Sequence, residues 1–484
     1  MTFDLELALK ANGTIIGMRG QIISDQGAYV RTLGMVNASL AITGLPGPYN
    51  IKNYSAEVVC SLTNKSPTST YRGAGAPEAT YARERLLDIA SHQLGIDPAE
   101  LRLKNLLPPE ALPHNIGLAN VECAVRYDSG DFPAALRQAM EKADYADFRK
   151  AQLQARSEGR LLGVGICVYV QQAAIGPYEG AEVRVDGNGN VAVVSGAAPQ
   201  GQGSATALAQ IVADQLEVPL ERVSVCFGDT ARIPFGVGTY ASRNAVMAGS
   251  AALGAAQQVR TKAIQLAAHL FEASPEDLEW KDGVARVVGV PDKGYTIAEL
   301  AQAAVPAGNR PPNTEPGLEA WYYFEKKEAP FSYGVHIGEV EVERETGDVK
   351  LRRYVVVNDC GRMINPMIVE GQIAGGIAQG VGGALLEELV YDAQGQLLTA
   401  SLLDYPLPTS LYLPPIEISH LISPTSLNPL GVKGVGEGGA IGAHAAIANA
   451  VADAIEHTGA RVRGTPLRPA VVWKLLNETV VQSA

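Results

Sequence analysis

The stretch GVKGVGEGGA, residues 431–440, decides how the rest of the chain is interpreted. It places one acid, Glu437, among five glycines, directly before an alanine-rich segment that predicts a helix over 440–457. A glycine loop that leads into a helix presents free backbone N–H groups and the positive end of the helix dipole, which together attract anions. A carboxylate in such a loop is partly desolvated, and desolvation raises its pKa toward the range of a general base. The alternative, an acid placed only to complement the helix dipole, stays open.

Two further glycine-rich regions precede predicted helices. The first is TYRGAGAPE at 70–78, and the second is QGQG at 200–203 with GTYASR at 238–243 further along. Each motif alone is more often an ordinary turn, but the three together predict a site for a long anionic ligand such as a dinucleotide pyrophosphate. Side-chain donors that could add hydrogen bonds to it are Gln200, Gln202, Thr239, Ser242 and Arg243. The sequence has no GxxxxGK[ST] and no GxGxxG followed by an acid about twenty residues later, which excludes a P-loop and gives no support to a Rossmann site.

Composition excludes several other classes of protein. The 484 residues correspond to roughly three domain-sized units, and a hydrophobic content of 46% can fill a sizeable core. The net charge of −12 argues against nucleic acid as the main partner. No run of eighteen apolar residues predicts a membrane span. Five scattered cysteines without a CxxC pair predict reduced thiols in the cytoplasm, and neither a zinc nor an iron–sulfur site inside this chain.

Periodicity predicts an α+β fold with more than one sheet. The chain opens with a hairpin whose turn is Asn12-Gly13, and a polar stretch at 156–160 marks a domain boundary. The predicted helices are 77–95, 98–106, 131–145, 146–157, 204–216, 242–270, 364–386 and 440–457. The predicted strands beyond the boundary are 162–170, 181–185, 191–195, 223–227, 336–344 and 349–358.

The motifs in this order resemble the large, molybdopterin-binding subunit of the molybdenum hydroxylases, the xanthine oxidase family. Within it, the chain is most similar to the bacterial carbon-monoxide-dehydrogenase-like and nicotine-dehydrogenase-like branch. The resemblance spans nearly the whole chain. It is carried by YRGAG at 71–75, QGQG at 200–203, GTYASR at 238–243, DCG at 359–361, EGQ at 370–372 and GVGE at 434–437.

The resemblance implies a fold of two elongated mixed α/β molybdopterin-binding domains, the C-terminal part of domain I at 1–155 and domain II at 160–484. It implies a molybdenum–molybdopterin cofactor, as the cytosine dinucleotide, whose metal is held by the pterin dithiolene and has no direct protein ligand. Glu437 would be the general base. The cofactor would be lined by Arg72, Gly73, Ala74, Gln200, Gly201, Gln202, Gly203, Thr239, Tyr240, Ala241, Ser242, Arg243, Lys433, Gly434, Val435 and Gly436.

The function that the resemblance implies is insertion of water-derived oxygen at an electron-poor carbon of an N-heteroaromatic substrate. The electrons would pass to [2Fe-2S] and FAD groups on partner subunits. An aldehyde-oxidising enzyme of the same family and a non-catalytic scaffold subunit remain as alternatives. The copper-containing enzymes of the family carry a cysteine where Gly73 stands, so carbon monoxide is not the expected substrate. Large subunits of the family extend upstream of Met1, and a separate chain is expected to supply that part.

Overall fold

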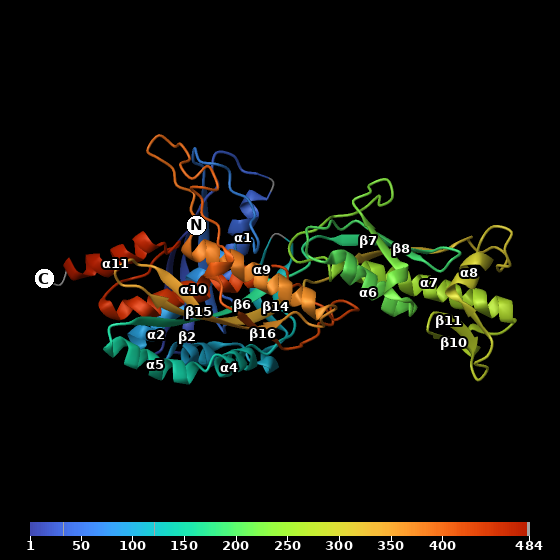
Figure 1. Ribbon diagram of the computed structural model, residues 1–484, viewed down its shortest axis with the longest axis horizontal. Helices are drawn as coiled ribbons and strands as arrows, with labels where there is room; N and C mark the ends of the chain where they lie inside the picture. The colour runs from blue at the N-terminus through green and yellow to red at the C-terminus, as the bar shows by residue number, and fades with distance from the viewer. Residues whose placement is uncertain (32, 121, 482–484) are drawn as a thin grey trace.

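The computed structural model describes residues 1–31, 33–120 and 122–481 (Figure 1). Its helices are α1 Gly34–Gly44, α2 Ala76–Leu94, α3 Pro98–Asn105, α4 Phe132–Lys142, α5 Tyr145–Ser157, α6 Ser204–Leu216, α7 Met247–Phe271, α8 Ile297–Ala303, α9 Pro366–Leu385, α10 Gly438–Ile455 and α11 Pro469–Val481. Its strands are β1 Thr2–Leu9, β2 Ile15–Asp25, β3 Asn53–Ser61, β4 His114–Ala119, β5 Ala124–Tyr127, β6 Leu161–Gln172, β7 Tyr178–Val185, β8 Val191–Ser195, β9 Val223–Phe227, β10 Leu278–Lys281, β11 Val284–Val287, β12 Gly294–Thr296, β13 Leu318–Glu325, β14 Phe331–Val342, β15 Val349–Asp359 and β16 Ile416–His420.

Two lobes lie side by side along the long axis of the molecule (Figure 1). One lobe is built on the sheet β16-β15-β14-β6, together with the sheet β1-β2-β3. The other is built on the sheet β13-β7-β8-β9, covered by α6 and α7. The α+β prediction with more than one sheet is therefore confirmed. The predicted domain boundary falls between α5 and β6, and the division into domains stays a prediction.

Helix α10 is the centre of the first lobe and carries Glu437 at its start. Its backbone lies directly on β6, because a Cβ added at Gly163 would come within 2.0 Å of the Ala450 carbonyl oxygen. On its other side α9 approaches equally closely, since a Cβ at Gly376 would meet the backbone of α10 at 2.8 Å. Only glycine fits at these contacts, so these glycines determine how closely α10 packs between β6 and α9.

A buried charged network fixes α2, the helix that follows the 70–75 loop. Glu84 is fully buried and accepts hydrogen bonds from Arg83 at 3.0 Å and Arg102 at 2.8 Å. The Val168 backbone N–H also donates to Glu84, at 3.2 Å, which joins α2 to β6. Buried charges persist where they are paired and hydrogen-bonded in this way. The middle of α2 is thus held against the strand that leads to the candidate site.

Most predicted elements are present, with one correction close to the site. The predicted helix over 242–270 begins only at Met247 in the structure. Ala241 and Ser242 have φ values of 46° and 49°, in the left-handed region, which a right-handed helix cannot contain. The residue types at 242–246 are compatible with a helix, so the sequence pattern placed the start of this helix too early.

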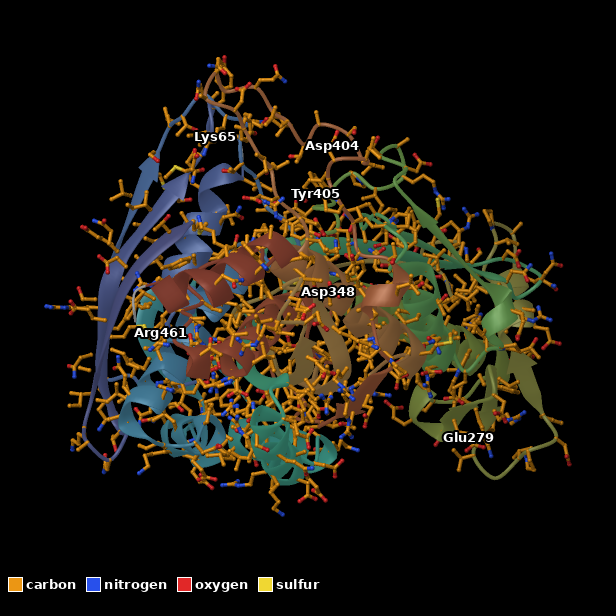
Figure 2. The ribbon with its side chains drawn as sticks, turned by 60° about the vertical axis from the view of Figure 1, so that its left-hand side comes forward. Lys65, Glu279, Asp348, Asp404, Tyr405 and Arg461 are labelled. Carbon is orange, nitrogen blue, oxygen red and sulfur yellow. The ribbon has the colours of Figure 1, made fainter. Side chains whose placement is uncertain are left out.

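Loop 386–409 and the segment after β3 project together from one end of the first lobe. Figure 2 shows Lys65 of that segment and Tyr405 of the loop at this end. The Ser66 backbone N–H donates to the Tyr391 hydroxyl at 3.3 Å, and the Lys65 ammonium lies 5.9 Å from the centre of the same ring. Among the described residues, no helix is long and apolar enough to cross a membrane.

Candidate active site

A cavity of about 1110 Å³ lies where the two lobes meet. Segments far apart in the sequence converge on it from α1, the 70–76 loop, the end of β6, the 200–211 region, the 239–245 loop, the start of α9 and the 432–437 loop. Every predicted site residue except Gly203 lines this cavity. The structure therefore brings together three glycine-rich regions, at 70–78, 200–243 and 431–440, that are separated by more than 100 residues in the chain.

Glu437 stands at the start of α10 with its carboxylate surrounded by donors. Its Oε1 accepts a hydrogen bond from the Gly73 backbone N–H at 3.1 Å. Its Oε2 accepts from the Gln171 amide at 2.6 Å and from the Ser242 hydroxyl at 2.7 Å. Burial raises the pKa of Glu437, while Ser242, Gly73, Arg72 and Gln171 oppose that rise. A buried carboxylate with a raised pKa, reached from the cavity, is suited to accept a proton.

Arg72 holds the loop that carries Glu437 through hydrogen bonds. Its guanidinium donates to the Gly436 carbonyl oxygen at 2.5 Å and to Gln379 Oε1 at 2.8 Å. It also donates to the side chain of Gln372 at 3.0 Å. These bonds show that Arg72 holds the loop within the protein.

The 200–203 and 238–244 loops are joined to each other by hydrogen bonds. The Thr239 hydroxyl accepts from the Ala198 backbone N–H at 2.8 Å and donates to Asn244 at 3.0 Å. The Gln200 amide donates to the Thr239 carbonyl oxygen at 3.1 Å, and Gln202 donates to the Ala198 carbonyl oxygen at 3.3 Å. The two loops thus form one wall of the cavity.

Two predicted contact residues direct their charged groups away from the cavity. The Arg243 guanidinium is 1% exposed as a side chain and pairs with Glu179 at 2.5 Å, with further bonds to the carbonyl oxygens of Ile175 and Tyr178. The Lys433 ammonium is 3.6 Å from the Asp359 carboxylate and donates to the Ser129 carbonyl oxygen at 3.2 Å. Both side chains therefore hold the loops in place, and the backbone atoms of these two residues are the groups that a ligand could contact.

The cavity offers backbone donors to an anionic ligand. Helix α6 begins at its wall with no side-chain cap on its first turn, which leaves N–H groups free for an anion. A Cβ added at Gly201, which has φ 93°, would meet no atom within 4 Å, so its backbone is bare on that side. Since Arg243 and Lys433 are paired with Glu179 and Asp359, the basic side chains left at the wall are Arg72 and Arg362, beside the acids Glu122 and Glu437.

Sequence reasoning missed several residues that contact the predicted ones. Gln171 on β6 touches Glu437, and no motif signals it because it lies in a strand of buried residues. Gln379 and exposed Arg362 also line the cavity. Gln372 stands within the EGQ motif at 370–372, so a signal for it existed.

We expect Gly434→Ala to lower cofactor content, because the loops are in contact at this position. An added Cβ would come within 2.5 Å of the Ser242 Cβ and 2.7 Å of the Ala173 Cβ, so the 239–243 loop must move. Metal and pterin content per chain, measured after purification, is expected to fall several-fold. The control is Gly464→Ala, where nothing lies within 4 Å. Equal content in both variants would contradict this interpretation of the cavity.

Fold and cavity together define a protein that holds a large anionic cofactor at the junction of two lobes. Residues 1–106 and 138–414 each match a family described as "Molybdopterin cofactor-binding domain". The chain belongs to this family of molybdopterin-binding domains, the xanthine oxidase family. The predicted family and fold are thereby confirmed.

Named relatives agree with this. The 6-hydroxypseudooxynicotine dehydrogenase complex subunit gamma of Paenarthrobacter nicotinovorans is 38% identical over 98% of this chain and 59% of its own length. The carbon monoxide dehydrogenase large chain of Hydrogenophaga pseudoflava is 34% identical over 98% of this chain and 60% of its own. The crystal structure of quinoline 2-oxidoreductase from Pseudomonas putida 86 superposes with a TM-score of 0.91 at 37% identity, covering 99% of this chain and 62% of that one. The chain thus spans about 60% of the length of the relatives that it matches.

The residues present fit a molybdopterin cofactor. Such a cofactor is a polyanion that is recognised through phosphate and ring polar groups, and the wall provides the uncapped start of α6, bare glycine backbone and neutral amides. Among the described residues, no cluster of three or more His, Cys, Asp or Glu side chains could hold a metal ion. A metal carried by an organic group is compatible with this wall, because it takes its ligands from that group.

Proposed function

We propose that this chain is the catalytic part of a molybdenum hydroxylase that acts together with partner subunits. The observation that carries the proposal is the buried carboxylate of Glu437, aimed into a cavity walled by the glycine loops. The cofactor, when bound, would accept the two electrons of the bond that is broken at the substrate carbon. Residues 1–155 and 160–484 would form the C-terminal part of domain I and domain II of the cofactor-binding fold.

Individual residues of this chain would have separate roles in the proposed reaction. Glu437 would take a proton from the attacking oxygen nucleophile, which derives from water. The Gly73 N–H would hold the carboxylate in place. Arg72 would hold the 434–437 loop through the Gly436 carbonyl oxygen. The start of α6 and the 239–243 loop would bind the phosphates of the cofactor, as the cytosine dinucleotide.

The proposed substrate is an N-heteroaromatic compound, since a ring carbon beside nitrogen is electron-poor and accepts attack by an oxygen nucleophile. Two relatives support this choice: one is named for 6-hydroxypseudooxynicotine and one for quinoline. Another relative is named for carbon monoxide, but this chain has Gly73 in the loop position where a thiolate is expected for that chemistry. Partners would carry [2Fe-2S] clusters and FAD, in a cytoplasmic complex.

We expect the purified complex to contain molybdenum and to reduce an electron-acceptor dye when an N-heteroaromatic substrate is added. Elemental analysis and dye reduction measure both properties on one sample. Quinoline, a pyridine derivative, an aromatic aldehyde and carbon monoxide should be compared side by side. Faster reduction with the aldehyde would transfer the proposal to aldehyde oxidation. Substrate-dependent turnover by a complex without molybdenum would reject the proposed function, and so would the absence of turnover in a complex that contains molybdenum.

A further inference from the structure

Gln171 lies next to Glu437, and the reaction proposed above gives it no role. It lies near the end of β6, is 4% exposed and reaches across to the start of α10. Its Nε2 lies 2.6 Å from Glu437 Oε2 and 2.7 Å from Ser242 Oγ. Ser242 Oγ is itself 2.7 Å from the same carboxylate oxygen. Three polar atoms from three separate segments thus form a closed triangle.

The protons of this triangle can be counted. An amide nitrogen carries two hydrogens and a hydroxyl carries one, so three contacts use all three protons. This requires that Gln171 donates to both partners and that Ser242 donates to Glu437. The reverse orientation of the amide would turn its oxygen toward an ionised carboxylate, placing two acceptors against each other. The amide orientation is therefore matched to the ionised form of Glu437.

The two carboxylate oxygens of Glu437 then differ in their remaining capacity. Oε2 accepts two hydrogen bonds, which occupy both of its lone-pair positions. Oε1 accepts one, from the Gly73 N–H, and keeps one lone pair free. A proton that arrives at Oε1 leaves every bond of the triangle unchanged. A proton at Oε2 would force the Ser242 hydroxyl to turn away.

We propose that Gln171 is a positioning residue for Glu437, holding Oε2 together with Ser242 so that Oε1 is the atom that receives the proton. This inference rests on the proposed function, since it assumes that Glu437 is the general base. The arrangement is set before the reaction begins, so no donor has to reorient when the proton moves.

The surroundings of Glu437 determine in which direction its pKa should change when Gln171 is replaced. Among the described residues, Arg72 is the charged group that acts on Glu437, and α9 holds Arg72 through the neutral amides of Gln372 and Gln379. Beneath the start of α10, the Tyr169 hydroxyl bonds to Asn358 at 3.0 Å. Burial raises the pKa of Glu437, and the donors stabilise its charged form. Loss of the Gln171 donors must therefore raise that pKa further.

The experiment replaces Gln171 with Met in the purified complex, which removes the donors and keeps the length of the side chain. We expect the acid limb of the kcat/KM profile to move to higher pH by on the order of one pKa unit. A second readout needs no turnover: the infrared band of the protonated carboxyl, identified by its loss in Glu437→Gln, should titrate at higher pH by the same amount. Ser242→Ala removes a different donor to Oε2 and should move both readouts in the same direction.

The matched control acts on the other end of the same amide. Ser332 on β14 lies 3.5 Å from Gln171 Oε1, so Ser332→Ala removes that contact and leaves both N–H donors in place. It should shift neither readout. If Gln171→Met and Ser242→Ala keep their molybdenum and shift neither readout, the inference is overturned. Should Gln171→Met fail to assemble, Ser242→Ala alone decides. Retained turnover in Glu437→Gln would instead overturn the proposed function on which the inference rests.

Discussion

Glu437→Gln is expected to lower kcat by about 10²–10⁴-fold, the usual contribution of a positioned general base. The amide has nearly the same shape as the carboxylate but cannot accept a proton at neutral pH. Molybdenum content should stay at the level of the unchanged protein, because Glu437 bonds to Gly73, Gln171 and Ser242 and is not needed as a metal ligand. Steady-state kinetics and elemental analysis on the same preparation measure both quantities.

The control for this variant is Glu370→Gln, another acid near the site. Glu370 lies on α9 with its side chain 53% exposed, and its nearest ion-pair partner is His420 at 3.8 Å. Its removal should change kcat by less than about twofold, as expected for an exposed charge. Because burial raises the pKa of Glu437, activity should rise with pH as Glu437 loses its proton, above the ordinary range for a glutamate. Turnover in Glu437→Gln close to that of the control would remove Glu437 as the base.

Arg243→Met is expected to lower the free energy of unfolding by about 3–5 kcal/mol, because it leaves Glu179 as an unpaired buried charge. The Arg243 and Glu179 side chains are 1% and 0% exposed. Arg243 also holds Ile175 and Tyr178 through their carbonyl oxygens, so the 238–243 loop should lose its fixed shape. Cofactor content should fall together with stability. Chemical denaturation and pterin analysis test the two effects.

A surface arginine of the same lobe provides the comparison. Arg184 on β7 pairs with Glu319 at 3.3 Å, and the two side chains are 62% and 40% exposed. Exposed pairs contribute about 0–1 kcal/mol, so Arg184→Met should leave stability and cofactor content nearly unchanged. Equal stability of the Arg243 and Arg184 variants would show that the buried pair does not hold the loop.

The sequence predicted the elements whose patterns are local. Helix α6 and strand β9 have the predicted bounds, because a glycine start and regular periodicity mark them without help from the rest of the fold. Strand β3 was missed even though Tyr54, Ala56, Val58 and Cys60 alternate, and α1 was missed because GMVNASLAITG contains few strong helix formers. The late start of α7 depends on left-handed residues, which periodicity cannot detect.

The sequence predicts which loops form the candidate site, but not how the side chains of these loops are arranged. Glycines next to helix starts can be read from local sequence, and the cavity collects the loops so identified. The roles of Arg243 and Lys433 were not predictable, since they depend on Glu179 and Asp359, which lie 64 and 74 positions away in the chain. Gln171 could not be found either, because only the contact between β6 and α10 brings it to Glu437.

Anomalous diffraction at the molybdenum edge from crystals of the purified complex tests the central claim most directly. The account predicts one molybdenum peak per chain inside the cavity, beside the Glu437 carboxylate and the Gly73 N–H, with pterin density leading toward the 200–203 and 239–243 loops. A peak outside this cavity, or no peak in a complex that turns over substrate, would contradict it.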